Sequence, residues 1–193
     1  MVAKIRRYQS PDEYPFTSPL PDPILPPLDY PLLLHPKRNI NVNKQLYDAY
    51  LKIVLPKITQ SLPDKGELRE NYGSSALCDV ECLQSLSRRI HFGKFVAEVK
   101  FRQDQENLTD LIISRDRKGL EDAITDSEVE RRVLERLRAK AEAYGRDPWS
   151  EDGVGNGVIK QKVDVAAVVE VYQHVVIPLT KQVEVDYLLA RLD

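Results

Sequence analysis

Two basic residues, Arg89 and Lys100, share one face of a predicted helix with apolar side chains. At about 100° per residue they lie roughly 20° apart, three turns from each other. The same face carries Cys82, Leu86, Gly93 and Val96. A cation inside an apolar stripe needs a partner, because burying an unpaired charge costs much free energy. The pattern therefore predicts either a structural ion pair, with Glu98 as one candidate acid, or a pocket that binds an anion. Gly93 favours the pocket, since glycine in a helix interior often permits a close approach.

A second pair, Thr180 and Glu184, lies four residues apart near the C-terminus and so shares a helix face. The apolar residues on that face are Val176, Ile177, Val183 and Tyr187. Desolvation raises the pKa of a buried carboxylate and favours its protonated form, which donates a hydrogen bond. Structural pairing of Glu184 with Lys100 or Arg89 and a functional role are equal alternatives on this pattern alone.

Together these residues indicate a site that binds a small dianion and stabilises charge on an oxygen without covalent chemistry. The sequence shows no nucleophile–base pair, no metal-ligand cluster and no phosphate-binding glycine loop, so we expect neither a cofactor nor a metal. Cys78 and Cys82 are predicted to be a pair of core thiols. The histidines, His35, His91 and His174, lack metal-ligand spacing and are predicted to be surface or hydrogen-bonded residues.

The composition is typical of a soluble globular protein with one domain. The chain has 193 residues, of which 42% are hydrophobic and 30% are charged. A net charge of -2 argues against nucleic acid as a partner. No apolar run is long enough to span a bilayer, and no secretory signal is visible at the N-terminus. We therefore expect a cytoplasmic protein that does not bind a membrane.

Periodicity predicts an all-α fold. The predicted helices lie near 42–60, 79–101, 104–114, 116–124, 127–144 and 162–192. Loops are expected at 61–75 and 145–160, where glycine and proline gather. Pro178 predicts a kink or a fresh start inside the last helix. Two capping boxes, Thr125-x-x-Glu128 and Ser127-x-x-Glu130, fit the start of the helix at 127–144.

Proline separates an N-terminal segment, residues 5–40, from a helical body, residues 41–193. Nine of the 13 prolines lie between Pro11 and Pro36, so neither a regular helix nor a central strand is expected there. The segment also carries many apolar side chains, including Phe16 and Leu32. We expect an extended strap packed on the body, with a mobile tail as the alternative.

Five blocks of the sequence, in the same order along the chain, resemble the eukaryotic, all-helical chorismate mutases. Their residues are most similar to those of the fungal members. The blocks are IRRYQSPDEYPF, NYGSSALCD, DVECLQSLSRRIHFGKFVAEVKF, SEVERRVLERLRAKAEAYG and IPLTKQVEVDYLLARLD. The resemblance covers essentially the whole chain. It implies a helical bundle that isomerises chorismate to prephenate, a unimolecular [3,3] shift at the entry to phenylalanine and tyrosine synthesis.

The resemblance also implies residue roles. Such a site must hold the two substrate carboxylates in a reactive diaxial chair and stabilise charge on the breaking ether oxygen. Arg89 matches a carboxylate clamp, and Lys100 and Glu184 match the two donors to the ether oxygen. Thr180 matches a substrate-contacting threonine, and Glu130 matches the acid that binds the ring hydroxyl. Asp126 stands where the fungal pattern has asparagine, which places a negative charge beside a dianionic substrate.

A regulatory site is implied as well. The residues that match those holding tyrosine or tryptophan between subunits are Arg6, Arg7, Asn71, Gly73 and Ser74. Leu77 occupies a position where the fungal pattern has threonine, so the response to tyrosine is expected to be altered or lost. The resemblance implies a homodimer for the full-length form.

Family members begin with a further segment that includes a helix whose arginine clamps the second carboxylate. On this basis the chain is expected to be an N-terminally truncated mutase. The alternative is a catalytically impaired paralogue or fragment that binds an aromatic amino acid or pairs with a full-length homologue.

Overall fold

The computed structural model describes residues 3–29, 31–35, 39–60, 69–145 and 163–193. Its α-helices are α1 (Asn43–Ala49), α2 (Leu55–Thr59), α3 (Tyr72–His91), α4 (Gly93–Gln103), α5 (Gln105–Ile113), α6 (Arg117–Ile124), α7 (Ser127–Gly145), α8 (Val165–Val171) and α9 (Ile177–Leu189). Short 3₁₀ turns occur at Arg7–Gln9 and Arg69–Asn71. None of the described residues lies in a strand, so the all-α prediction is confirmed.

Most predicted helix limits agree with the structure, and the largest difference is at α3. The helices predicted at 104–114, 116–124 and 127–144 are α5, α6 and α7. The helix expected to begin at 79 begins at Tyr72 and is divided at Phe92 into α3 and α4. The predicted loop at 61–75 is therefore wrong for its last four residues, where one glycine did not stop the helix. Residues 61–68, 146–160 and 162 of the predicted loops and last helix lie outside the described residues.

Pro56 and Pro178 each lie within a long run of helical residues, and a π-helical turn precedes each of them. The turn Tyr50–Val54 joins α1 to α2, and the turn Tyr172–Val176 joins α8 to α9. In the second turn the Ile177 amide donates to the Tyr172 carbonyl, five residues back. Pro178 then lies in the first turn of α9, and the π-helical turn before it accommodates a residue without an N–H. The helix does not start afresh at Pro178, because the backbone stays helical from α8 through this turn into α9.

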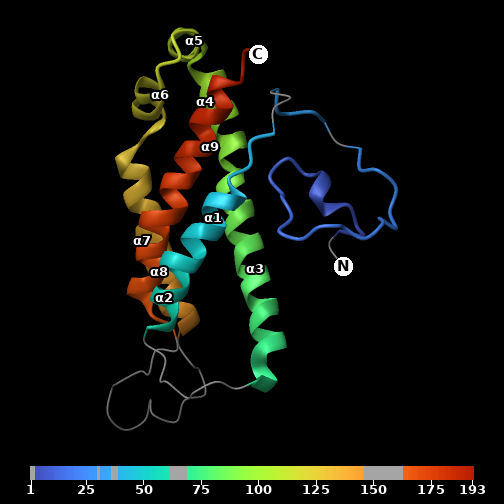
Figure 1. The fold of residues 1–193 in the computed structure, drawn as a ribbon. Coiled ribbons are helices and arrows are strands. Elements are labelled where there is room, and N and C mark those ends of the chain that lie inside the picture. Colours follow the sequence, from blue (N-terminus) through green and yellow to red (C-terminus); the bar gives the residue numbers. More distant parts are fainter. Residues whose placement is uncertain (1–2, 30, 36–38, 61–68, 146–162) are drawn as a thin grey trace.

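Helix α9 lies at the centre of the body, between α4 on one side and α6 and α7 on the other (Figure 1). It contributes to both apolar clusters of the core. Val183 belongs to a cluster with residues of α1, α3 and α8, whereas Val185, Tyr187 and Leu188 belong to a cluster with residues of α4, α5 and α6. Because α9 is packed on several sides, its polar residues are held in fixed positions relative to α4 and α7.

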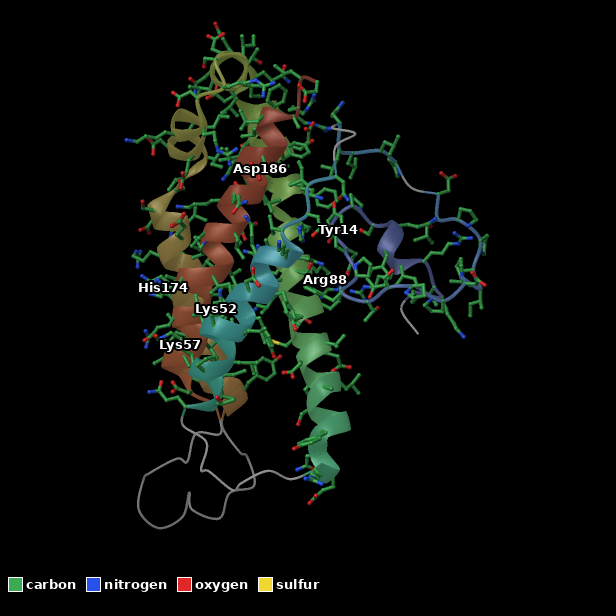
Figure 2. All side chains as sticks on the ribbon, in the orientation of Figure 1. Tyr14, Lys52, Lys57, Arg88, His174 and Asp186 are labelled. Carbon is green, nitrogen blue, oxygen red and sulfur yellow. The ribbon has the colours of Figure 1, made fainter. Side chains whose placement is uncertain are left out.

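The strap lies to one side of the helical body, and Tyr14 lies where the two meet (Figure 2). It is fastened mainly by polar contacts. Lys94 Nζ donates to the Pro11 carbonyl at 2.9 Å, and Gln84 Nε2 donates to the Tyr14 carbonyl at 3.0 Å. Phe16 and Leu34 add apolar packing on the two clusters of the core.

The expectation that the strap buries its apolar residues on the body is wrong for its middle. The exposed ones are Ile24, Leu25, Leu28, Leu32 and Leu33, and Leu32 is 92% exposed. The attachments to the helices lie near the two ends of the segment, so the proline-rich stretch between them reaches away from the body (Figure 1). Tyr30, Pro36 and two neighbours lie outside the described residues.

The first two turns of α3 are exposed on all sides. Cys78 lies on this part of the helix and is exposed, whereas Cys82, one turn later, is half-buried against the core. The prediction of two core thiols is therefore wrong for Cys78, because the body does not reach the start of α3. Tyr72, Leu77 and Val80 are exposed there as well.

Candidate active site

A pocket of about 320 Å³ lies among α3, α4, α7 and α9. Its polar lining residues are Arg89, Lys100, Asp126, Glu130, Thr180, Lys181 and Glu184. Its apolar lining residues are Val96, Ile124, Val129, Val133, Val176 and Ile177. The structure therefore brings all six residues that the sequence suggested for substrate and catalysis around one pocket, and it adds Lys181.

Lys100 and Glu184 face each other across the space between α4 and α9. Lys100 Nζ lies 3.1 Å from Glu184 Oε2 and 2.5 Å from the Ile124 carbonyl oxygen. The ammonium has three N–H donors and two of them are used, so the third is available to a ligand. The alternative pairing of a pocket cation with Glu98 is wrong, because that carboxylate bonds Arg102 and Arg191 instead.

Glu184 is 6% exposed, as its apolar face predicted. Burial raises the pKa of this carboxyl above its usual range, and the nearby ammonium of Lys100 and guanidinium of Arg89 offset the rise only in part. A raised pKa favours the protonated carboxyl, which donates a hydrogen bond. Glu184 therefore lies beside the pocket with its pKa shifted in the direction that a neutral acid needs.

The two cations are less buried than the apolar stripe predicted. Arg89 is exposed, and the Lys100 side chain is 33% exposed. Arg89 makes no hydrogen bond or ion pair with any residue that the structure describes. The stripe borders an open pocket at this level rather than a packed neighbour, so the guanidinium keeps its water and its donors stay available to an anion.

Thr180 is half-buried at the same level of α9. Its hydroxyl donates to the Val176 carbonyl at 2.7 Å, one turn earlier in the helical path. The hydroxyl proton is therefore directed to the helix backbone rather than to the pocket. The oxygen still has lone pairs that can accept a hydrogen bond from the pocket.

Lys181 is the charged pocket residue that sequence reasoning missed. Its Nζ lies 2.7 Å from Glu130 Oε1 and joins α9 to α7 across the pocket. The signal was present, since Lys181 lies three residues before Glu184 and therefore near the same helix face. The pair fixes the Glu130 carboxylate and adds a third cation to the lining.

Asp126 lies at the start of α7 and is exposed. Its Oδ1 accepts hydrogen bonds from the Glu128 and Val129 amides, both at 3.0 Å. Asp126 is thus the residue that caps α7, and the two capping boxes predicted from Thr125 and Ser127 do not form. The carboxylate lines the pocket while one of its oxygens is held by the positive end of the helix.

The residues suggested for an effector are not gathered in one place within the chain. Arg7 lines a cavity of about 700 Å³ between the strap and α3, together with Leu77. Arg7 Nε also donates to Glu13 Oε1 at 2.8 Å, and Arg6 Nε donates to the Leu25 carbonyl. Asn71, Gly73 and Ser74 lie at the start of α3 and do not line this cavity.

The residues that the structure describes contain neither a cluster of metal ligands nor a membrane-spanning helix. No group of three or more histidine, cysteine, aspartate or glutamate side chains there could hold a metal ion. None of the helices in these ranges is long and apolar enough to cross a membrane. His91 is buried and hydrogen-bonded and His174 is exposed, so the prediction of surface or hydrogen-bonded histidines is confirmed for these two.

The lining as a whole suits a small anion. Three cations, Arg89, Lys100 and Lys181, face two carboxylates and a third carboxyl whose pKa is raised. Arg89 and one donor of Lys100 are not engaged by the described residues, so the pocket offers charge-assisted hydrogen bonds to an incoming carboxylate or oxygen. With Glu184 protonated, donors to an oxygen come from opposite sides of the pocket.

Comparison with known proteins identifies relatives along the whole chain. The profile of the family described as "Chorismate mutase type II" matches residues 71–185. A chorismate mutase from Emericella nidulans is 53% identical over 196 residues, covering 100% of this chain and 71% of the relative. The crystal structure of Candida albicans Aro7p chorismate mutase in complex with L-Trp superposes with a TM-score of 0.83 at 45% identity, covering 98% of this chain and 69% of that one. AtCM1 with tyrosine in its allosteric site gives 0.81 at 40% identity, with 99% and 73% covered.

Proposed function

Since the chain belongs to the chorismate mutase type II family, we propose that its pocket isomerises chorismate to prephenate with Lys100 and Glu184 as the catalytic pair. The reaction breaks one C–O bond and forms one C–C bond within a single molecule. No group has to attack the substrate, which agrees with a pocket lined by hydrogen-bond donors. The observation that carries the proposal is the buried Glu184 carboxyl, with a raised pKa, 3.1 Å from Lys100 Nζ.

The pair acts on the ether oxygen, where negative charge develops as the C–O bond breaks. Lys100 donates through its remaining N–H, and protonated Glu184 donates through its O–H. Preorganised donors that face developing charge lower the barrier without reorganising during the reaction. The low exposure of Glu184 supports this role, since burial raises the pKa of its carboxyl and so favours the protonated form.

The other lining residues bind and orient the substrate. Arg89 clamps a carboxylate, for which a forked guanidinium is the suitable donor. Lys181 holds Glu130, and Glu130 accepts a hydrogen bond from the ring hydroxyl. Thr180 contacts the substrate through its oxygen. Holding both carboxylates in the diaxial chair supplies the orientation that a unimolecular shift requires.

Asp126 adds a negative charge at the edge of the same pocket. Its Oδ1 is engaged with two amides of α7, which stabilises the charge and turns that oxygen away from the pocket. We infer that the substrate is bound despite Asp126, with a weaker affinity than an asparagine at this position would give.

An effector site is proposed at the cavity between the strap and α3. Related structures hold L-Trp in Aro7p and tyrosine in the allosteric site of AtCM1. In this chain Arg7 offers a cation to the cavity, and Leu77 offers an apolar side chain. The residues at the start of α3 lie outside this cavity, so we propose that Asn71, Gly73 and Ser74 complete a site formed between two subunits of a homodimer.

The test is turnover of chorismate by the 193-residue protein, followed as loss of chorismate and appearance of prephenate. Turnover that falls about 10²–10³-fold in Lys100→Met supports the proposal, since removing one such donor has an effect of that size. Lys118→Met is the matched control, because Lys118 is exposed on α6 and does not line the pocket. A folded chain without turnover would overturn the proposal and favour the alternative, a protein that binds an aromatic amino acid.

A further inference from the structure

Helices α4 and α9 pack tightly against each other at Gly93, the first residue of α4. A Cβ atom placed on Gly93 would lie 3.1 Å from Thr180 Cγ2, 3.2 Å from Glu184 Cγ and 3.2 Å from the Thr180 carbonyl oxygen. Contacts this short force neighbouring atoms to move by a few tenths of an ångström. The residues that would move are two of those that line the pocket.

Position 93 requires a residue without a side chain, because a Cβ atom there would crowd Thr180 and Glu184 of α9. The backbone of Gly93 does not have the positive φ that only glycine adopts easily. Alanine in a helix is more stable than glycine by about 1 kcal/mol, so helix stability does not favour glycine either. The missing side chain is what lets the Glu184 stem lie directly against the α4 backbone.

We propose that Gly93 is a positioning residue for the rearrangement, because it sets the distance between α4 and α9 and thereby places the Glu184 carboxyl opposite Lys100. The inference rests on the function proposed above. Lys100 lies two turns further along α4 from Gly93, and its Nζ is 3.1 Å from Glu184 Oε2. Moving α9 outward therefore changes the geometry of the donor pair. Arg89 lies one turn before Gly93, near the end of α3.

The first test is Gly93→Ala. We expect kcat to fall about tenfold while KM changes by less than threefold, because displacing a catalytic group by a fraction of an ångström affects the transition state more than the bound substrate. Gly145→Ala is the matched control. Its added Cβ would meet Val163 at 3.5 Å, an ordinary contact, and Gly145 lies outside the pocket, so kcat should stay within twofold.

The second test is rescue by Thr180→Ser, which removes the methyl group closest to the new Cβ and keeps the hydroxyl. We expect Gly93→Ala to lower kcat less in the Thr180→Ser background than in the unmodified protein, about threefold instead of tenfold. A crystal structure of Gly93→Ala should show the Thr180–Glu184 turn displaced from α4 by several tenths of an ångström. That measurement does not depend on turnover, so it separates failure of this inference from failure of the proposed function.

Three results would overturn the inference. One is a Gly93→Ala protein with unchanged kcat and an undisplaced Glu184. Another is a loss of kcat that is the same in both backgrounds, because the methyl contact would then play no part. The third is a Gly93→Ala protein that no longer unfolds cooperatively, since the fold itself would then require the glycine.

Discussion

Two buried carboxyl groups in the helical body differ in the direction in which their pKa is shifted. Glu98, on α4, is 3% exposed, and Glu184, on α9, is 6% exposed. Hydrogen bonds from Arg191, Tyr187 and Arg102 outweigh the effect of burial and hold the pKa of Glu98 below its usual range. Burial dominates at Glu184 and raises its pKa. Two carboxyl groups of low exposure therefore have pKa values shifted in opposite directions, down at Glu98 and up at Glu184.

The difference lies in how many donors each carboxylate has. Tyr187 Oη donates to Glu98 Oε2 at 2.6 Å, and Arg191 Nε donates to the same oxygen at 2.7 Å. Glu184 has one ionic partner within 4 Å among the described residues, Lys100, and a pocket beside it. A buried charge that is fully bonded belongs to the architecture, whereas one left partly unbonded beside a cavity is available for chemistry.

The first prediction concerns Glu98, the carboxylate with several hydrogen-bond donors. Removing it tests the comparison with Glu184 most directly. Glu98→Ala leaves the Arg191 guanidinium, whose side chain is 14% exposed, without its ionic partner. Removing one member of a buried pair costs about 3–5 kcal/mol. We expect the free energy of unfolding in urea to fall by that amount, while kcat of the protein that remains folded changes less than threefold. A loss below 1 kcal/mol would show that Glu98 is not a structural anchor.

The second prediction concerns the poorly bonded carboxylate. Glu184→Ala should lower kcat about 10²–10³-fold, as expected for loss of one donor to a developing oxyanion, without lowering the free energy of unfolding. In the unmodified protein kcat should fall as the pH rises through the raised pKa of Glu184, because the ionised carboxylate cannot donate. Glu184→Gln donates at every pH, so its kcat should not change with pH. A pH profile shared by both proteins would argue against Glu184 as the acid.

Much of this arrangement could be predicted from the sequence, and the parts that could not depend on neighbours distant in the chain. Helical spacing and the resemblance placed Glu184 on a buried face and selected the residues of the pocket. The exposure of Arg89 depends on the absence of a packed neighbour at that level, which no local pattern records. The Lys181–Glu130 pair joins α9 to α7, and a sequence does not specify which exposed charges will meet. The sequence did not predict that the middle of the strap extends away from the body, because a proline-rich segment has no hydrophobic periodicity to interpret.

The third prediction concerns His91, which is fully buried and hydrogen-bonded at both ring nitrogens, and so resembles Glu98 rather than Glu184. The Val42 amide donates to His91 Nε2 at 3.0 Å, so that nitrogen has no proton, and Nδ1 lies 2.8 Å from the Ser87 carbonyl. Burial, together with the charge of Lys94, lowers the pKa of His91 to about 4. The unfolded chain takes up this proton at about pH 6.5, and the folded protein resists it until about pH 4. The stability from His91 is therefore present above pH 6.5 and is lost as the pH falls towards 4.

The measurement is the free energy of unfolding in urea at a series of pH values. Between pH 7.5 and pH 5 we expect a loss of about 2 kcal/mol attributable to His91. Taking the difference between the unmodified protein and His91→Gln isolates this contribution from that of Glu184, which changes with pH in the opposite direction. His174→Gln is the control, because His174 is exposed and should not alter the slope. Equal slopes in the unmodified protein and His91→Gln would contradict the prediction.

The smallest predicted effect is at Asp126, whose carboxylate is bonded on one side and faces the pocket on the other. Asp126→Asn keeps an oxygen that can accept from the Glu128 and Val129 amides, so the cap of α7 survives while the charge is removed. One charge near an exposed ligand contributes about 1 kcal/mol. We therefore expect KM for chorismate to fall about fivefold, with kcat within twofold. Asp116→Asn removes the same charge from the equivalent cap of α6, outside the pocket, and should leave KM unchanged.

The gain in affinity for chorismate in Asp126→Asn should shrink at high salt, because solvent ions screen an exposed charge. If KM stays the same at low ionic strength, the bonds to α7 neutralise Asp126, and this carboxylate belongs with Glu98 rather than with Glu184.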